Sequence, residues 1–162
     1  MSWDIDVTRC ANHLREHTGE EINFLSVDSP KSALRWAETA WLGFGEESPA
    51  PREFREFALA CSSDSALRLV VAANGNRDIG SFIMTLPPDR DGAGIYYFSV
   101  IPEFRRRGAA TAMMLEAGRA ALSSKKCGII LQATPTGALF YSHFGFNALF
   151  EIPLFSTDND VF

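Results

Sequence analysis

One segment of the chain combines a run of arginines with small residues where a strand is expected to end and a helix to begin. It is segment 100–111, with the sequence VIPEFRRRGAAT, and the small residues include Gly108 and Ala110. The first turn of a helix offers unpaired backbone N–H groups and the positive end of the helix dipole. Small residues there let an anionic ligand approach the backbone closely. The pattern predicts a phosphate-binding turn, and from the spacing alone a tight turn with solvated arginines fits equally well.

A tyrosine in an apolar stretch is the second candidate for chemistry. Tyr141 precedes Gly145 and Phe146 in the sequence YSHFGF. Taken by itself, such a tyrosine is more often a core residue whose hydroxyl binds a polar partner. The chain lacks both the Gly-Lys-Ser/Thr of a nucleotide phosphate loop and the Gly-x-Gly-x-x-Gly of dinucleotide-binding proteins. Its three histidines lack the spacing of metal ligands, so no metal is expected.

The elements that must position these residues are a strand, a helix and a second strand. Residues 95–100 and 128–133 are apolar enough for buried strands, and residues 109–122 carry an apolar stripe at helical spacing. This order places the two strands parallel in one sheet. Residues 135–144 predict a further helix, and residues 148–155 predict a last strand.

The first half of the chain predicts more strands and helices around the same sheet. Strands are expected at 22–27, 67–73 and 79–86, and helices at 7–17, from Pro30 and from Pro51. Asn74-Gly75-Asn76 predicts a hairpin turn between two of these strands. We therefore expect an α+β fold in one domain, 1–162, with residues 1–20 as an N-terminal helical extension. Its sheet is mixed and mostly antiparallel, with a parallel βαβ centre flanked by helices.

Composition narrows the class of protein. A chain of 162 residues with 46% hydrophobic residues is long enough for one domain with a core. Its net charge of −5 disfavours nucleic acid or an anionic membrane surface as the main partner. The three cysteines are widely spaced and predict neither a zinc site nor a disulfide framework. Reduced thiols and an acidic N-terminus without a signal-peptide pattern favour a cytoplasmic location.

Two segments together resemble motifs of the GNAT superfamily of N-acetyltransferases. Segment 100–111 is similar to the family's acyl-CoA loop, Arg/Gln-x-x-Gly-x-Gly/Ala. Segment 131–146, LQATPTGALFYSHFGF, is similar to the family's fifth strand and following helix, including the Tyr-x-x-x-Gly-Phe ending. The two motifs stand in the expected order, about thirty residues apart. The upstream helices and hairpin also follow the family's order.

The resemblance implies acetyl-CoA as co-substrate and direct transfer of its acetyl group to a primary amine in a ternary complex. It implies that the last expected strand before the turn binds pantetheine through its backbone, and that loop N–H groups bind pyrophosphate while arginine side chains extend outward. Tyr141 would donate a proton to the leaving thiolate. The implied cofactor-binding residues are Phe98, Ser99, Val100, Arg105, Arg106, Arg107, Gly108, Ala109, Ala110, Thr111 and Thr134. Thr134 stands where many relatives carry Asn.

The acceptor side is less well defined. Strand 95–100 has no carboxylate to serve as the general base that many relatives place there. The base is therefore unassigned, with Glu46, Glu47, Tyr96 or a water chain as candidates. The acceptor is expected to be a small-molecule or peptide amine, and the resemblance is compatible with a homodimer. Candidate acceptor-binding residues are Trp41, Phe44, Glu46 and Tyr96.

Two other functions stay open at this point. The missing strand carboxylate favours a non-catalytic domain that holds acyl-CoA as a sensor or partner subunit. The arginine run would allow nucleic-acid binding, which predicts steep salt dependence and a basic face. The net charge of −5 disfavours that second alternative.

Overall fold

The computed structural model describes residues 1–4 and 22–153. Within them, six strands form one sheet in the order β1-β6-β5-β4-β3-β2. The strands are β1 (Ser2–Asp4), β2 (Ile22–Ser26), β3 (Leu67–Asn74), β4 (Arg77–Thr85), β5 (Gly92–Val100) and β6 (Gly128–Leu131). The helices are α2 (Pro30–Gly43), α3 (Arg52–Ser62), α4 (Ala109–Ser123), α5 (Pro135–His143) and the short 3₁₀ helix η1 (Pro102–Phe104). None of these helices is long and apolar enough to cross a membrane.

The sheet topology confirms the predicted α+β fold. Strands β2 to β5 form an antiparallel meander, and Gly75 turns the β3–β4 hairpin with a φ of +57°. Strands β5 and β6 are parallel and are joined through α4, as the strand–helix–strand order predicts. The one parallel pair of the described sheet therefore lies directly beside the helix that begins at Gly108.

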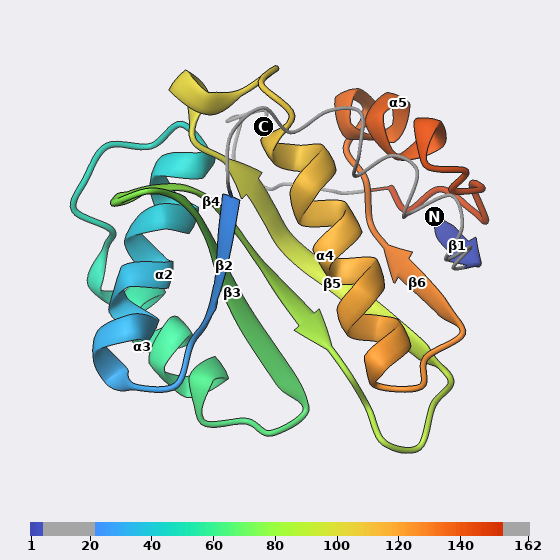
Figure 1. Ribbon diagram of the computed structural model, residues 1–162, viewed down its shortest axis with the longest axis horizontal. Coiled ribbons are helices and arrows are strands. Elements are labelled where there is room, and N and C mark those ends of the chain that lie inside the picture. The colour runs from blue at the N-terminus through green and yellow to red at the C-terminus, as the bar shows by residue number, and fades with distance from the viewer. Residues whose placement is uncertain (5–21, 154–162) are drawn as a thin grey trace.

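Helices cover both faces of the sheet, so alternate residues of a strand belong to different cores. Val70 and Phe82 pack in the cluster that contains Met113 of α4. Val71 and Ile83, their alternates, pack with Trp36 of α2. Figure 1 shows α4 crossing one face of the sheet, with α2 and α3 at the β2–β4 half and α5 beyond β6.

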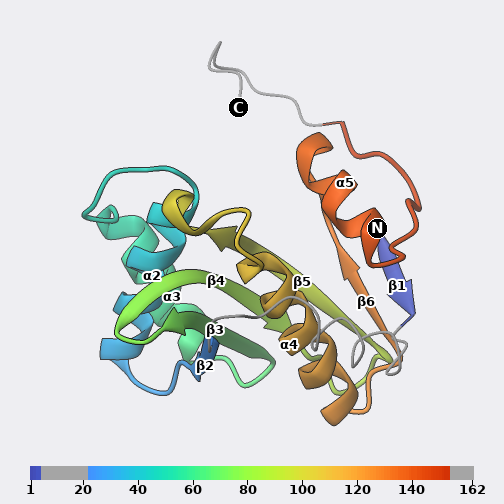
Figure 2. The same cartoon turned by 45° about the horizontal axis from the view of Figure 1, so that its top comes forward.

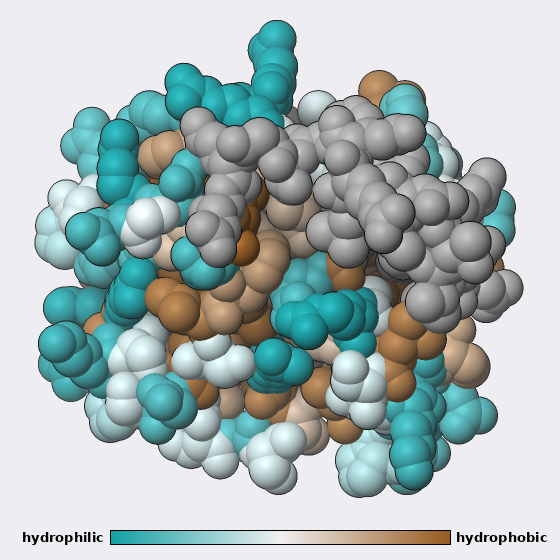
Figure 3. All heavy atoms as spheres, in the orientation of Figure 1, coloured by the Kyte–Doolittle hydropathy of each residue, from teal (hydrophilic) through white to brown (hydrophobic). Residues whose placement is uncertain are grey.

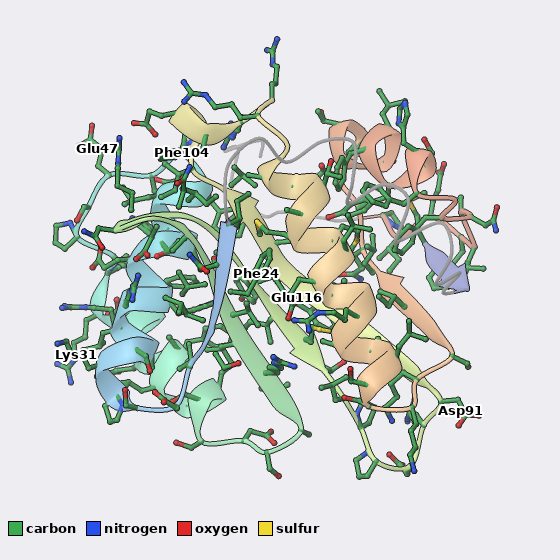
Figure 4. The ribbon with its side chains drawn as sticks, viewed as in Figure 1. Phe24, Lys31, Glu47, Asp91, Phe104 and Glu116 are labelled. Atoms are coloured by element: carbon green, nitrogen blue, oxygen red, sulfur yellow. The ribbon has the colours of Figure 1, made fainter. Side chains whose placement is uncertain are left out.

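A buried ionic group marks the α4 face. Glu116 is 6% exposed and contacts Arg119 at 2.6 Å and Arg68 at 3.9 Å. Hydrophilic residues gather at the middle of this face in Figure 3, where Figure 4 labels Glu116. The arginines neutralise a carboxylate that would otherwise be costly to bury in the Met-rich core.

Two sequence predictions at the ends of the chain need correction. Residues 148–153 form no strand, although the sequence predicts one over 148–155. Residues 2–4, expected to be part of a helical extension, form the edge strand β1, and Ser2 pairs with Ile130 of β6. Because β1 occupies the outer edge of β6, that edge is closed to a strand from the end of the chain. The helix predicted at 7–17 lies outside the described residues.

Candidate functional site

A wedge opens between β5 and β6 because their pairing stops early. The parallel register runs from Gly92 opposite Gly128 to Ile95 opposite Leu131. Strand β5 continues to Val100, so no described strand pairs with that edge of residues 96–100. Figure 2 shows β5 and β6 separating towards the end where α5 lies. The exposed edge offers backbone donors and acceptors to an extended ligand.

A β-bulge shapes β5 along this wedge. Ser81 pairs with Ser99, and Ile83 pairs with Tyr96, so Phe82 faces two residues of β5. The backbone of Tyr97 is strained at this bulge. Its φ is +50°, in the left-handed region that residues other than glycine rarely adopt. The bulge places the consecutive residues Tyr96 and Tyr97 on the same face of the sheet, and Phe98 faces the other side.

Phe98 points towards the α4 and α5 side. Its ring centroid lies 6.1 Å from that of Tyr141 and 6.2 Å from that of Phe140. Tyr97 points towards α2 and α3, with its ring 6.0 Å from Trp36 and 5.1 Å from Phe57. The wedge therefore has one aromatic wall on each side of β5.

The predicted phosphate-binding turn has the expected backbone. Arg106 and Gly108 have φ angles of +58° and +84°, and Gly108 is the N-cap of α4 without a side-chain cap. Within the described part of the chain, no acceptor binds the backbone N–H groups of residues 106–111. Ala109 is buried, and Ala110 and Thr111 begin the helix beside it. These N–H groups form a concave set of donors suited to an anion.

Arg105 is exposed, but its guanidinium turns back onto the protein, contrary to the expectation that all three arginine side chains extend outward. Its guanidinium donates to the carbonyl oxygen of Val100 at 3.0 Å and to that of Gly43 at 3.0 Å. It thus ties the end of β5 to the end of α2. Arg106 and Arg107 are exposed, and the Arg107 guanidinium lies 6.0 Å from the Phe104 ring centroid. Phe104 lies on η1, at the end of the molecule opposite Asp91 (Figure 4).

Tyr141 is a buried side chain with a polar hydroxyl, and it lies beside the wedge. It is 7% exposed and packs against Phe98, Phe140 and Phe146. Burial raises the pKa of its hydroxyl to about 12. The phenol therefore stays protonated at neutral pH and is a hydrogen-bond donor.

Three other predicted cofactor residues use their side chains within the protein. The Thr134 hydroxyl accepts from the Gly137 N–H at 3.1 Å and caps α5. The Ser99 hydroxyl is buried 3.5 Å from the Ala40 carbonyl oxygen. The Phe98 ring packs in the core beside α4. A ligand in the wedge would meet mainly the backbone of β5.

The structure does not bring the four candidate acceptor residues into one pocket. The Trp41 indole donates to the Glu47 carbonyl oxygen at 3.0 Å. Phe44 packs against Tyr97, with ring centroids 6.1 Å apart. The Tyr96 ring lies over Gly94, since a Cβ there would be 2.8 Å from it. Glu46 lines a separate cleft beside α2 and η1.

This separate cleft is open, with a volume of about 510 Å³, and lies between α2, the start of β4 and η1. Its lining residues are Glu38, Thr39, Leu42, Gly45, Glu46, Arg77, Asp78, Ile101, Pro102, Glu103 and Phe104. None of them belongs to the wedge edge at 96–100. Across residues 1–4 and 22–153, no group of three or more metal-ligating side chains is assembled.

The sequence analysis did not single out Tyr97, whose positive φ accompanies the β-bulge. The signal was present in the run Tyr96-Tyr97-Phe98, where the apolar alternation of strand 95–100 breaks. Consecutive large aromatic residues in a half-covered strand are compatible with an inserted residue.

The family is decided by a match to residues 65–148, just over half of the chain, described as an acetyltransferase (GNAT) domain. The chain belongs to the GNAT family of acetyltransferases. The match includes the hairpin, the bulged strand, the turn at Gly108 and Tyr141. A search of curated proteins found no match to this sequence.

Solved structures share the fold of this GNAT protein at low sequence identity. A transcriptional regulator from Bacillus halodurans is 19% identical with a TM-score of 0.68, covering 84% of this chain and 99% of that one. An aminoglycoside N-acetyltransferase in complex with CoA is 14% identical with a TM-score of 0.68, covering 86% and 97%. A predicted acetyltransferase with acetyl-CoA from Clostridium acetobutylicum is 18% identical with a TM-score of 0.61, covering 84% and 96%.

Proposed function

We propose that this GNAT protein is an N-acetyltransferase that moves an acetyl group from acetyl-CoA to a primary amine within a ternary complex. The observation that carries the proposal is the meeting of the unpaired β5 edge at 96–100 with the uncapped N-terminus of α4. An extended amide arm ending in a pyrophosphate matches these two features in order. The proposed unit spans residues 1–162 as one domain.

The residues present fit such a co-substrate. The N–H groups of 106–111 would bind the pyrophosphate, and Arg106 and Arg107 would add charge from the exposed side. The β5 backbone between Tyr96 and Val100 would pair with the pantetheine amides as an added strand. Thr134 lies at the α5 N-cap, across the wedge from that edge.

Tyr141 is proposed as the proton donor to the departing sulfur. In the reaction, the amine nitrogen bonds to the acetyl carbon, the carbon–sulfur bond breaks and the thiolate takes a proton. A phenol of pKa about 12 is uphill of a thiol near 8.5, so full transfer ahead of bond cleavage is unfavourable. A donor positioned in the same apolar wall stabilises the developing negative charge by partial transfer, and burial also raises the pKa of the thiol.

The amine must reach the acetyl carbon in its neutral form. Strand β5 carries no carboxylate, so the amine proton leaves to water or to a loop acid, Glu46 or Glu47. We therefore expect the rate to rise with pH as the free amine fraction increases, with no second limb from Tyr141 below about pH 10.

The test is thiol release from acetyl-CoA in the presence of a panel of primary amines. Acceptor-dependent release, with the acetylated product confirmed by mass spectrometry, is the expected result. Tyr141→Phe should lower kcat by about 10²–10⁴-fold, the usual range for losing a general acid, while acetyl-CoA affinity changes little. Equal losses in turnover and affinity would assign Tyr141 a role in packing alone.

The absence of a carboxylate from β5 favours one second candidate, a non-catalytic acyl-CoA-binding domain. Tight acetyl-CoA binding by calorimetry without acceptor-dependent thiol release across the panel would select that function.

A further inference from the structure

An aromatic surface borders the wedge on the side opposite α4. Phe44, Tyr96 and Tyr97 are 48%, 47% and 40% exposed. Phe44 and Tyr97 are in ring contact, and Tyr96 is adjacent on the strand. Large aromatic side chains exposed together usually mark a binding surface. We call Phe44, Tyr96, Tyr97 and the neighbouring Ile130 the aromatic face.

The bulge and the glycines of β5 create this face. Ala93 and Ile95 are buried in the α4 core, so Gly94 and Tyr96 point to the other side of the sheet. Gly94 pairs with Ile130, which is 53% exposed between the buried Ile129 and Leu131. Figures 1 and 2 show α2 and α3 over the β2–β4 half of the sheet, away from β6. Tyr96 and Ile130 are therefore left uncovered, and the ring of Tyr97 is covered on one side by Trp36 and Phe57.

The aromatic face and the proposed proton donor Tyr141 lie on opposite sides of the same stretch of β5. Tyr97 on this face is followed by Phe98, whose ring meets Tyr141 on the other face. A molecule on the aromatic face would approach β5 from the side opposite Tyr141. In this arrangement a nucleophile can add to the acetyl carbon from one side of β5 while Tyr141 lies near the departing sulfur on the other.

We propose that the acceptor is a primary amine carried by an aromatic or similarly flat apolar group, whose ring lies on the aromatic face. This inference rests on the proposed acetyltransferase function and assigns its acceptor class. Ring-on-ring contact would supply most of the affinity, since each buried aromatic ring removes a large apolar area from water. Exposed Glu46 and Glu47 follow Phe44 in the loop and favour the approach of a monocation.

The same face is poorly suited to polyhydroxylated or polycationic amines. The side chains of the aromatic face carry two phenol hydroxyls and no carboxylate. Hydroxyl and ammonium groups buried against it would lose their hydrogen bonds to water without replacement. An aminoglycoside or a polyamine is thus expected to be a weak acceptor.

The experiment measures thiol release from acetyl-CoA with 2-phenylethylamine, n-butylamine, spermidine and an aminoglycoside. These amines differ in ring content and charge and share the reacting group. We expect kcat/KM for 2-phenylethylamine to exceed that of each of the other three by about tenfold or more, as apolar pockets discriminate by 10–200-fold per group. Equal or higher kcat/KM for spermidine or the aminoglycoside would overturn the proposal.

Variants localise the preference. Tyr97→Asn keeps a residue that tolerates the φ of +50° and removes the ring, and Phe44→Ala removes its partner. Each should raise KM for 2-phenylethylamine about fivefold to tenfold more than it raises KM for n-butylamine. Leu25→Ala is the matched control, because Leu25 is an exposed apolar residue of β2 far from the wedge. Equal effects of Tyr97→Asn on both amines would contradict the assignment.

A binding measurement separates this inference from the proposed function. Saturation-transfer NMR with 2-phenylethylamine and CoA reports contact without turnover. Binding that Tyr97→Asn abolishes, with no thiol release from any amine, would uphold the aromatic face and reject the acetyltransferase. Turnover of n-butylamine with no contact from 2-phenylethylamine would uphold the enzyme and reject the aromatic acceptor.

Discussion

The guanidinium of Arg105 donates to the carbonyl oxygen of Gly43 at 3.0 Å, across 62 residues of chain. Its Nε also binds the Val100 carbonyl oxygen. One side chain therefore joins the turn before α4, the end of β5 and the end of α2, where the loop with Phe44 begins. Arg105, which the family resemblance implies as a cofactor-binding residue, thus connects three elements of the fold through its side chain.

Arg105→Ala should raise KM for both acetyl-CoA and the amine several-fold, because the turn and the Phe44 loop lose their common anchor. We expect a loss of about 1 kcal/mol in unfolding free energy, the usual net value for such hydrogen bonds on a partly exposed group. Steady-state kinetics with each substrate varied, together with urea unfolding, measure both. Arg106→Asn removes an exposed charge and keeps a residue suited to positive φ. A larger increase in KM from Arg106→Asn than from Arg105→Ala would mean that the exposed charge matters more than the hydrogen bonds of Arg105.

Gly108→Ala should weaken CoA binding more than Arg107→Ala. A side chain at a φ of +84° costs about 1–2 kcal/mol and displaces the N–H donors of the turn. Gly75→Ala is a matched control, because Gly75 has a φ of +57° in open space on the β3–β4 hairpin, outside the turn at Gly108. Both glycine variants should lose similar stability in thermal unfolding, while only Gly108→Ala should raise the calorimetric Kd for CoA, by about tenfold. If Arg107→Ala has the greater effect, the turn binds through side-chain charge.

Tyr141 should make the fold sensitive to alkaline pH. Its folded pKa of about 12 lies above the unfolded value near 10, so the folded state holds this proton more tightly. Its contribution is complete below pH 10 and is lost as pH rises towards 12, at most about 3 kcal/mol. Urea unfolding of wild type and Tyr141→Phe at pH 8 and 11 measures the difference. A wild-type curve that falls no faster than that of the variant would disprove the shift.

Gly43→Ala should destabilise the protein, because its Cβ would lie 2.8 Å from the Cβ of Ser99. Overpacking of this kind costs about 1–3 kcal/mol. Ser99→Gly in the same chain should restore much of the loss, and a double-mutant cycle in urea measures the coupling. Additive effects of the two substitutions would show that α2 and β5 are not in direct contact here.

The βαβ centre and the meander could be predicted because their signals are local. Hydrophobic periodicity, the Asn74-Gly75-Asn76 turn and the glycine at the α4 N-cap each act within a few residues. Strand β1 could not be predicted in this way. Three residues carry no periodic signal, and their pairing with β6 depends on a contact between distant parts of the chain.

The site shows the same division. The backbone donors of the turn and the burial of Tyr141 follow from the motif residues themselves. The hydrogen bond from Arg105 to the Gly43 carbonyl oxygen depends on where α2 ends. The backbone strain at Tyr97 depends on the register between β4 and β5. Both are tertiary effects that residue types and spacings do not encode on their own.

The wedge also has a consequence for the order in which the molecule assembles. Strands β3, β4 and β5 are joined by short connections with antiparallel pairing, whereas β6 reaches β5 only after α4 has crossed the sheet. Short-range pairings form faster than long-range ones. We therefore expect the β3–β5 hairpins to form before β6 docks, so that a chain paused at that stage has part of its sheet but no wedge between β5 and β6.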